Sequence, residues 1–263
     1  MQWEQLTAPD FSKAVQETGV CILAFGVIER HGDHLPLGTD YLNGHRLACL
    51  SAENEPAVVF PPFYFGQIYE ARCFPGTVTL KPTLLLEMLS AVLDEIGRNG
   101  FTKIILLNAH GGNDALLPFL TQTMLWEKKS YSVYYYDAYR EASATPEWKQ
   151  TLQTTQHGHA CECETSISLA NHPHLVRMDQ VNGIGESQDM LDELPGNFSA
   201  ISWYANYPQH YAGDARSAPA EKGQKLQAIK VKAFAKFIGA VKRDTIVPML
   251  EAEFFERESR LRK

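Results

Sequence analysis

The chain has 263 residues, 44% of them hydrophobic, with five cysteines and a formal net charge of −7. This composition indicates a globular protein with a substantial core, and the acidic balance argues against nucleic-acid binding, which needs a clustered basic face. No apolar span of about 18 residues predicts a membrane helix, and the first residues lack the apolar core of a signal peptide, so we expect a single cytosolic domain, residues 1–263.

Continuous apolar runs predict strands that are buried on both faces of a sheet. These runs lie at residues 20–27, 57–60, 103–107 and 131–136. Helical patterns alternate with them at residues 41–51, 82–98, 114–127 and 217–241. Pro82 in a first helical turn and Gly100 beyond a last turn are common start and stop signals. The alternation predicts an α/β fold, a three-layer sandwich in which helices cover both faces of a largely parallel sheet.

The last third of the chain is expected to hold one long loop and two helices. Residues 173–211 are irregular and rich in glycine, proline and aromatic residues, as in loops that form lids or oligomer contacts. The helix at 217–241 should bury one apolar stripe, made of Leu226, Ile229, Ala233, Phe237 and Val241. The charged tail to residue 263 is also predicted to be helical.

A short segment after the first strand, residues 26–40, concentrates side chains that bind metals, among them His34. Glu29 and His31 are two residues apart, so in an extended chain they point to one side with Cβ atoms roughly 6.5 to 7 Å apart. Metals in a dinuclear hydrolase lie roughly 3.5 to 4 Å apart, so each residue can serve one ion. Asp40, which follows a turn with proline and glycine, can bridge the two ions.

Other histidines and acids are grouped further along the chain. A single histidine is usually a solvated or hydrogen-bonded side chain, so only the clustering favours a metal site. The later groups lie at residues 108–113 and 159–166. Ligands in parallel sheets gather at the carboxyl ends of the strands, and Glu29, His110 and Asp137 each follow a predicted strand. The sequence therefore predicts a site at this edge of the sheet.

The cysteines are predicted to be reduced thiols, because their number is odd and no export signal is seen. Cys161 and Cys163 resemble a ligand pair in composition. Two residues apart on a helix, however, they face different ways, so we do not expect them to bind a metal.

These blocks together resemble the signatures of the creatininase family of metal-dependent amidohydrolases. The similar segments are Glu-x-His-Gly-x-His-Leu-Pro-Leu-Gly-Thr-Asp at 29–40, Asn-x-His-Gly-Gly-Asn at 108–113, and the third block at 159–166. In the third block, His-Ala-Gly-x-x-Glu-Thr-Ser in the family, Cys161 replaces the glycine. Residues 74–80 and 213–223 also resemble family blocks, so the resemblance spans about residues 20–240.

The resemblance implies a ligand set for two divalent ions. Glu29 and His110 would bind one ion, His31 the other, and Asp40 would bridge them. In creatininases proper a further carboxylate lies two residues after the second-block histidine, where this chain has Gly112. Glu164 of the third block is the expected substitute. Zinc is the first expectation for the ions, and manganese or iron also suit histidine and carboxylate ligands.

The remaining polar residues of the three blocks receive supporting roles. His159 is expected to be the catalytic proton shuttle. If Glu164 is not a metal ligand, it is expected to be a catalytic acid/base group. His34 would hold a ligand or the substrate, or only make a structural hydrogen bond. Asn113 is assigned to the same supporting or substrate-contacting role.

The implied reaction is hydrolysis of a carbon-nitrogen bond in a small polar metabolite, a cyclic amide or formamide. Two divalent ions lower the pKa of a bridging water and polarise the carbonyl, so that a hydroxide attacks. Creatininases clamp a flat ring with tryptophans, one of them just before the third-block histidine, and residues 153–158 contain none. Creatinine itself is therefore in doubt; Trp148 is the nearest tryptophan, and Tyr134 to Tyr136 are expected as alternative pocket residues.

Two other functions stay open at this point. The first is ring opening of a sugar-like lactone or ketone, which the same hydroxide can perform. The second is a metal-binding or assembly protein without activity, for which Gly112 would mark a decayed site. The resemblance also implies a homo-oligomer, a hexamer in the family, with the loop at 173–211 as the expected subunit contact.

Overall fold

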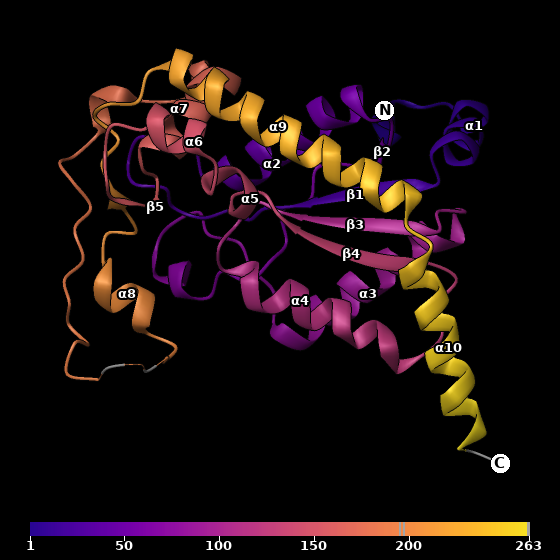
Figure 1. The fold of residues 1–263 in the computed structure, drawn as a ribbon. Helices are drawn as coiled ribbons and strands as arrows, with labels where there is room; N and C mark the ends of the chain where they lie inside the picture. Colours follow the sequence, from indigo (N-terminus) through magenta and orange to yellow (C-terminus); the bar gives the residue numbers. More distant parts are fainter. Residues whose placement is uncertain (195, 197, 262–263) are drawn as a thin grey trace.

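The computed structural model describes residues 1–194, 196 and 198–261, and its centre is a four-stranded sheet (Figure 1). The strand order is β2-β1-β3-β4, and all three neighbouring pairs are parallel. The strands are β1 (Val20–Phe25), β2 (Val58–Val59), β3 (Lys103–Asn108) and β4 (Ser132–Asp137). All four predicted strands are present, and the parallel sheet is confirmed.

Helices follow the strands, as the sequence pattern predicts. The longer ones are α1 (Ala8–Thr18), α2 (Thr39–Asn54), α3 (Pro82–Arg98), α4 (Asn113–Thr123), α7 (Glu162–Asn171), α9 (Ala220–Arg243) and α10 (Ile246–Arg260). Short helices are α5 (Arg140–Ser143), α6 (Pro146–Thr151) and α8 (Ser202–Asn206). Single 3₁₀ turns lie at Trp3–Gln5, Glu70–Cys73, Met124–Trp126, Pro173–Leu175 and Met178–Gln180. A small antiparallel pair, β5 (His157–His159) and β6 (Ala212–Gly213), lies apart from the main sheet.

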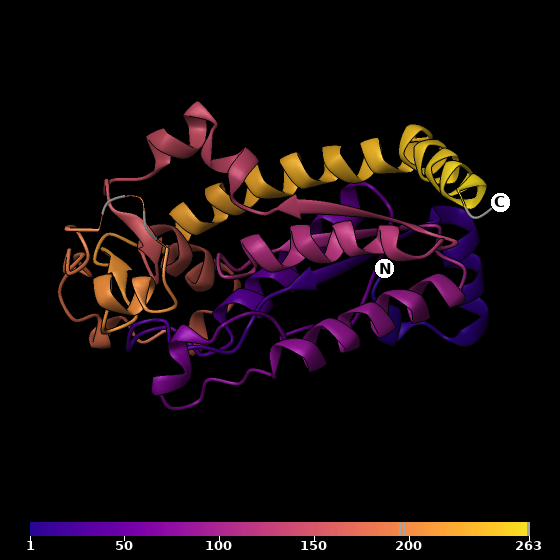
Figure 2. The same cartoon turned by 90° about the horizontal axis from the view of Figure 1, so that it is seen from below.

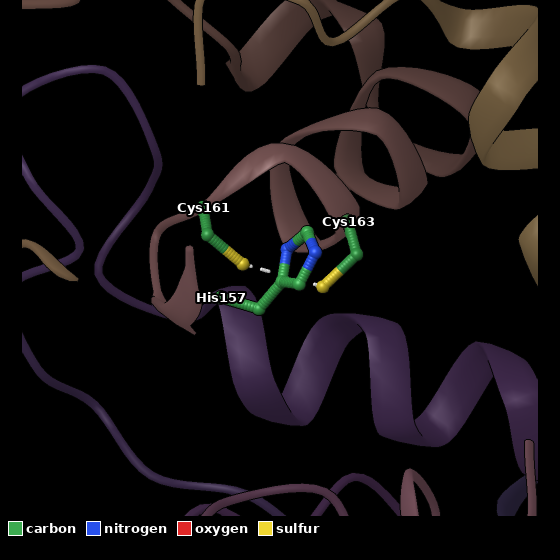
Figure 3. A group of neighbouring side chains, drawn as sticks. All are labelled: His157, Cys161 and Cys163. Atoms are coloured by element: carbon green, nitrogen blue, oxygen red, sulfur yellow. Dashed lines mark hydrogen bonds between the residues drawn. The ribbon is translucent and has the colours of Figure 1, made fainter. Parts of the chain in front are cut away.

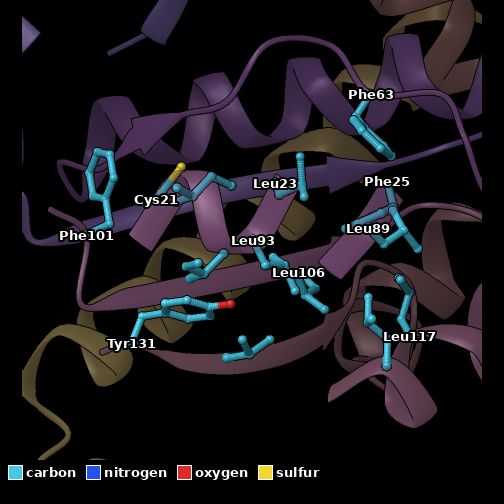
Figure 4. Close-up of a cluster of buried hydrophobic side chains, with 14 of the residues drawn as sticks. Cys21, Leu23, Phe25, Phe63, Leu89, Leu93, Phe101, Leu106, Leu117 and Tyr131 are labelled. Carbon is cyan, nitrogen blue, oxygen red and sulfur yellow. The ribbon is translucent and has the colours of Figure 1, made fainter. Parts of the chain in front are cut away.

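Alternate residues of the strands enter two separate cores, because successive side chains of a strand point to opposite faces. On one face Leu23 and Phe25 pack with α1, α3 and α4. Figure 4 shows them with Leu89 and Leu93 of α3 and Leu117 of α4. On the other face Ile22 and Ala24 pack with α2 and α9. Figure 1 shows α2 and α9 above the sheet and α3 and α4 below it. The three-layer sandwich is therefore confirmed, and the buried strand residues explain the uninterrupted apolar runs.

Helix α3 matches its predicted bounds, because its end signals are strong. Pro82 occupies its first turn, and the chain leaves through Asn99 and Gly100, which has a φ of +101°. Helix α1, which the sequence pattern did not single out, begins with the Thr7 side chain accepting a bond from the Asp10 amide. It ends at Gly19 with a φ of +62°.

The buried stripe of α9 differs from the predicted one. Its fully buried members include Leu226, Lys230, Phe234, Ile238 and Val241, whereas Ile229, Ala233 and Phe237 are half-buried. The physical reason is the close contact with α7. A Cβ atom on Gly223 would lie 1.8 Å from the Ser166 carbonyl oxygen, so glycine lets the two helices approach and rotates the buried face.

One end of the molecule gathers the remaining elements. In Figures 1 and 2, α7, β5 and α8 lie beyond the end of the sheet toward which the strands point. Residues 173–211 are largely irregular there, as predicted, apart from α8 and two 3₁₀ turns. Among the described residues, no helix combines the length and the apolar character that crossing a membrane requires.

Candidate metal centre

Acidic and histidine side chains converge at the carboxyl ends of the sheet strands. Glu29 lies in the loop after β1, His110 follows β3, and Asp40 lies in the first turn of α2. His31 lies in the loop after β1, and Glu164 comes from the first turn of α7. All five side chains are buried. Buried charges need partners, so this grouping points to a cation site.

The first group of ligand atoms consists of Glu29, Asp40 and His110. Nε2 of His110 lies 2.9 Å from the carbonyl oxygen of Gln67, which only accepts, so Nε2 carries the proton. Nδ1 lies 2.9 Å from one carboxylate oxygen of Glu29 and 2.9 Å from one of Asp40. These two oxygens make no hydrogen bond to another described residue. When the imidazole is neutral, its Nδ1 lone pair therefore faces two carboxylates, and either a proton or a metal ion fits between them.

The second group consists of His31, Asp40 and Glu164. Nδ1 of His31 donates to the Glu29 carbonyl oxygen at 3.2 Å, so the lone pair of Nε2 faces Asp40 Oδ1 at 3.0 Å. Glu164 Oε2 accepts from the Ala160 amide at 2.6 Å. Asp40 thus turns one oxygen toward each group. This is the geometry expected of a carboxylate that bridges two ions.

Protons and metal ions would compete for the same places in this cluster. Burial opposes a charge on His110, but the carboxylates of Glu29 and Asp40 outweigh it and raise the pKa of His110 well above its usual range. In the same way, Asp40 overcomes the effect of burial and raises the pKa of His31 to about 9. Burial, together with nearby negative groups, raises the pKa of Glu164 to about 8. Without metal, protons therefore neutralise the buried carboxylates, and divalent ions can replace them.

His159 lies directly against this cluster. Its Nε2 donates to the Arg30 carbonyl oxygen at 2.7 Å, and its ring stacks on His31 with centroids 4.1 Å apart. Burial lowers its pKa to about 3, so the imidazole is neutral, with its proton on Nε2 and a lone pair on Nδ1. A ligand atom of His159 also lies within 4.8 Å of those of Glu29 and His31. With a lowered pKa the ring gives up a proton readily, so it can carry one only transiently beside the two groups of ligand atoms.

His210 is a site residue that the sequence analysis missed. Its Nε2 hydrogen-bonds the Glu29 carboxylate, and its Nδ1 accepts from the Trp203 indole at 3.2 Å. This bond occupies one oxygen of Glu29 and leaves the other facing His110, an arrangement typical of groups that orient metal ligands. The only sequence signal was its place just before the block at 213–223.

His34 and Asn113 lie beside the two groups of ligand atoms and belong to neither. His34 hydrogen-bonds Thr165 of α7 at 2.9 Å, next to Glu164 in the chain, and burial lowers its pKa to about 4. Asn113 is fully buried, and its Oδ1 accepts from the Gln67 amide at 2.9 Å. Asn113 thereby fixes the loop whose carbonyl oxygen orients His110.

Gly112 has no room for the carboxylate that creatininases proper carry there. A Cβ atom would lie 2.4 Å from His110 Nε2 and 2.5 Å from Gln67 Oε1. The Gln67 side chain occupies this space instead. A ligand at residue 112 would require the Gln67 loop to move.

A cavity of about 1260 Å³ opens onto the cluster. Glu29, Asp40, His110, His159 and Glu164 contribute to its wall. Its aromatic wall residues are Phe119, Tyr139, Trp148, Phe198 and Trp203. The expectation for Tyr134 to Tyr136 was wrong, because none of the three lines the cavity. Tyr136 packs in the core with Phe234, and the hydroxyls of Tyr134 and Tyr135 donate to Asp244 and Asp114. Successive side chains of β4 point to the two faces of the sheet, and therefore not toward the cavity at its end.

Known proteins resemble this chain over nearly its whole length. The profile of the family described as creatininase, creatinine amidohydrolase, matches residues 4–238. Creatinine amidohydrolase of Pseudomonas putida is 24% identical over 252 residues, covering 88% of this chain and 93% of that protein. The 3-dehydro-scyllo-inosose hydrolase of Thermotoga maritima is 26% identical, covering 84% of this chain and 77% of that protein. The mycofactocin precursor peptide peptidase of Mycolicibacterium smegmatis is 29% identical, covering 81% and 82%.

Solved creatininase structures share the fold. A mutant creatininase described as the Zn-Zn type has a TM-score of 0.80 at 22% identity, covering 92% of this chain and 98% of that chain. The structure described as creatininase Mn has a TM-score of 0.76 at 21% identity, covering 92% and 99%. With the family profile spanning residues 4–238, the chain belongs to the creatininase family and is a hydrolase.

Proposed function

We propose that this hydrolase cleaves the carbon-nitrogen bond of an amide or formamide in a small polar metabolite, at a centre for two divalent ions. The single observation that carries the proposal is the Asp40 carboxylate, which gives one oxygen to each of two groups of ligand atoms. Amidohydrolase and peptidase are among the names of its relatives, and both describe hydrolysis of bonds to nitrogen.

The proposed ligands follow from the two groups. One ion would be held by Glu29, His110 and Asp40, and the other by His31, Asp40 and Glu164. Histidine and carboxylate donors suit zinc, manganese or iron, and zinc is our first choice. Two of the similar solved structures are described as a Zn-Zn type and as creatininase Mn. When bound, the ions would polarise the carbonyl and lower the pKa of a water between them.

His159 is the proposed proton carrier. Hydrolysis adds the oxygen of a water to the carbonyl carbon, and one proton of that water must reach the departing nitrogen. The neutral imidazole of His159, fixed by the Arg30 carbonyl oxygen, can take this proton and pass it on. His210 and Gln67 would contribute by holding Glu29 and His110 in place.

The cavity supports a substrate with a flat or apolar part. Trp203 lies edge-on to His159, with ring centroids 6.0 Å apart, and Trp148 lines the same cavity. Trp203 comes from α8 rather than from residues 153–158, the stretch just before His159, where the family resemblance leads us to expect a tryptophan. We therefore place creatinine below other amides and formamides as the substrate.

A second candidate is ring opening of a sugar-like lactone or ketone. The resemblance to the Thermotoga maritima inosose hydrolase, 26% identity over 243 residues, favours it. The two reactions differ in their products, because only hydrolysis of a carbon-nitrogen bond frees an amine nitrogen, which stays in the product when the amide is cyclic and leaves it when the amide is open-chain.

The experiment is a screen of the metal-replete protein with cyclic amides, formamides, short peptides and lactones. Product amine and product acid are measured together. Asp40→Ala should abolish any true activity, whereas Glu53→Ala, an exposed change on the same helix, should retain it. Acid formed from a lactone but no new amine nitrogen formed from any amide or formamide, with the activity abolished in Asp40→Ala, would replace the amide proposal by the ring-opening one.

Assembly and location remain part of the proposal. We propose a cytosolic homo-oligomer, supported by five cysteines that are all free thiols. Exposed apolar residues between 173 and 211, such as Met190, Phe198 and Ile201, supply a surface for subunit contacts.

A further inference from the structure

A second cluster of metal-ligating side chains lies beside the hydrolytic centre. His157 of β5, Cys161 and Cys163 place one ligand atom each within 4.8 Å of one another (Figure 3). The two sulfurs are 3.3 Å apart. Both cysteines are buried and His157 is exposed, and all three line the large cavity. The cluster is therefore reachable from solvent on its histidine side.

The local backbone explains why the two cysteines meet, contrary to the expectation from the sequence. That expectation placed both residues on a helix, where residues two apart diverge. Helix α7 begins only at Glu162, and Cys161 is its cap in an extended conformation, with φ −79° and ψ −173°. Ala160 before it has a φ of +56° and turns the chain back from β5. This turn directs the Cys161 sulfur toward both Cys163 and His157.

The donor set differs in kind from that of the hydrolytic centre. Two sulfurs and an imidazole are soft ligands of the Cys₂His type, typical of zinc, whereas the carboxylates of the other centre are hard ligands. A tetrahedral zinc with bonds to sulfur of about 2.3 Å holds its sulfurs roughly 3.8 Å apart. The observed 3.3 Å is thus about half an ångström short of that separation. It is also far above the roughly 2.05 Å of a disulfide bond.

We propose that His157, Cys161 and Cys163 bind one thiophilic divalent ion such as Zn²⁺, separate from the two ions of the hydrolytic centre. Each thiol gives its proton to solvent on binding, and the fourth position is left to water from the cavity. The bound ion would fasten the turn that carries His159, because two of its ligands flank that residue in the chain. The inference rests on this cluster alone and does not depend on the reaction.

Cobalt titration of the reduced, metal-stripped full-length protein tests the proposal. Thiolate bound to Co²⁺ gives a charge-transfer absorption in the near ultraviolet, which histidine and carboxylate ligands do not give. We expect one equivalent of cobalt to produce this band in the wild type. Cys161→Ser and Cys163→Ser should lose both the band and that equivalent, and His157→Ala should weaken binding at least tenfold. Cys73→Ser, which removes an exposed free thiol outside the cluster, is the matched control and should keep them.

Two further measurements keep the outcome decisive. Asp40→Ala should retain the band even when it loses the other ions, which separates this site from the proposed function. If a cysteine variant fails to fold, alkylation of the wild type tests the proposal instead. Two thiols should resist alkylation when zinc is present and react when it is absent, as counted by mass spectrometry. A wild type without the band, a band retained in Cys163→Ser, or thiols equally reactive with and without zinc would overturn the proposal.

Discussion

Nδ1 of His110 lies 2.9 Å from Oδ2 of Asp40, and neither atom carries a proton when the imidazole is neutral. The proton of His110 is on Nε2, which donates to Gln67. The other oxygen of Asp40 faces the lone pair of His31 in the same way, at 3.0 Å. Two imidazole lone pairs directed at one buried carboxylate are unfavourable unless protons or metal ions lie between them.

Asp40 is therefore the residue on which both ions depend. We expect Asp40→Ala to lose both divalent ions, and Glu29→Ala to weaken chiefly the ion shared with His110, because Glu29 belongs to one of the two proposed ligand sets. Metal content per chain after gentle purification, measured by mass spectrometry, checks this. Glu53→Ala is the control. A single ion per chain that survives in Asp40→Ala would contradict the dinuclear centre.

His159 should affect catalysis more than metal content. We expect His159→Gln to lower kcat by about 10²- to 10⁴-fold, the usual contribution of a positioned proton carrier, with both ions retained. The exposed His174→Gln serves as the control for a histidine change. Loss of an ion in His159→Gln would instead make His159 a ligand, since its ring also lies near Glu29 and His31.

Local signals in the sequence were sufficient for most of the fold. The strands β1 and β3 were predicted almost to the residue. A strand that is buried on both faces carries apolar residues at successive positions, so it appears in the sequence as an uninterrupted apolar run. The bounds of α3 were predicted because a proline lies in its first turn and a glycine follows its last turn. The buried face of α9 was not predicted correctly, because it depends on how closely Gly223 lets α7 approach.

The candidate site was predictable only where its residues share a motif. Glu29 and Asp40 lie eleven residues apart, and the family resemblance linked them to the later blocks. His210 contacts Glu29 from 181 residues away, so no local pattern could pair them. The meeting of Cys161 with Cys163 depends on the exact start of α7, and helix ends are uncertain by one or two residues from sequence.

Acid should weaken the fold through Glu162. This buried carboxylate pairs with Lys222 and accepts bonds from Gln153 and Thr154, and these contacts outweigh burial and hold its pKa below the usual range. A lowered pKa stabilises the fold above the unfolded value of about 4.3, and this stability is lost as pH falls through the folded pKa.

Glu162→Gln removes this contribution and leaves Lys222 buried without its partner. We expect about 3 kcal/mol less stability at pH 7 in urea unfolding, with the difference from wild type shrinking below about pH 4. Glu256→Gln, in an exposed pair with Arg260, is the control and should leave the urea midpoint of unfolding equal to that of the wild type. A difference that stays constant down to low pH would contradict the assignment.

The assembly is expected to exceed a dimer. Family resemblance implies a hexamer, and the irregular segment with Phe198, 94% exposed, supplies apolar surface next to the cavity. Sedimentation of the purified chain should show a homo-oligomer, and Phe198→Ser should shift it toward smaller species, whereas Thr151→Ser should not. A fully active monomer would contradict this prediction.

Glu164 has two possible roles, and mutation separates them. Its Oε2 is bonded to the Ala160 amide, and a ligand atom of its carboxylate lies within 4.8 Å of those of His31 and Asp40. As a ligand it would replace the carboxylate that Gly112 lacks. As a free acid/base group it would leave the second ion to His31 and Asp40 alone, which are too few protein donors for a divalent ion.

We therefore expect Glu164→Gln to lower the occupancy of the second ion and to regain part of it, with part of the activity, in excess metal. The amide keeps the size of the carboxylate and loses the negative charge that a divalent ion requires, so the defect should be one of affinity. Metal content and activity are measured across a series of metal concentrations, with Glu53→Gln as the control. Full occupancy of both ions in Glu164→Gln, combined with a pH-rate profile that has lost one limb, would show that Glu164 moves a proton and does not hold the ion.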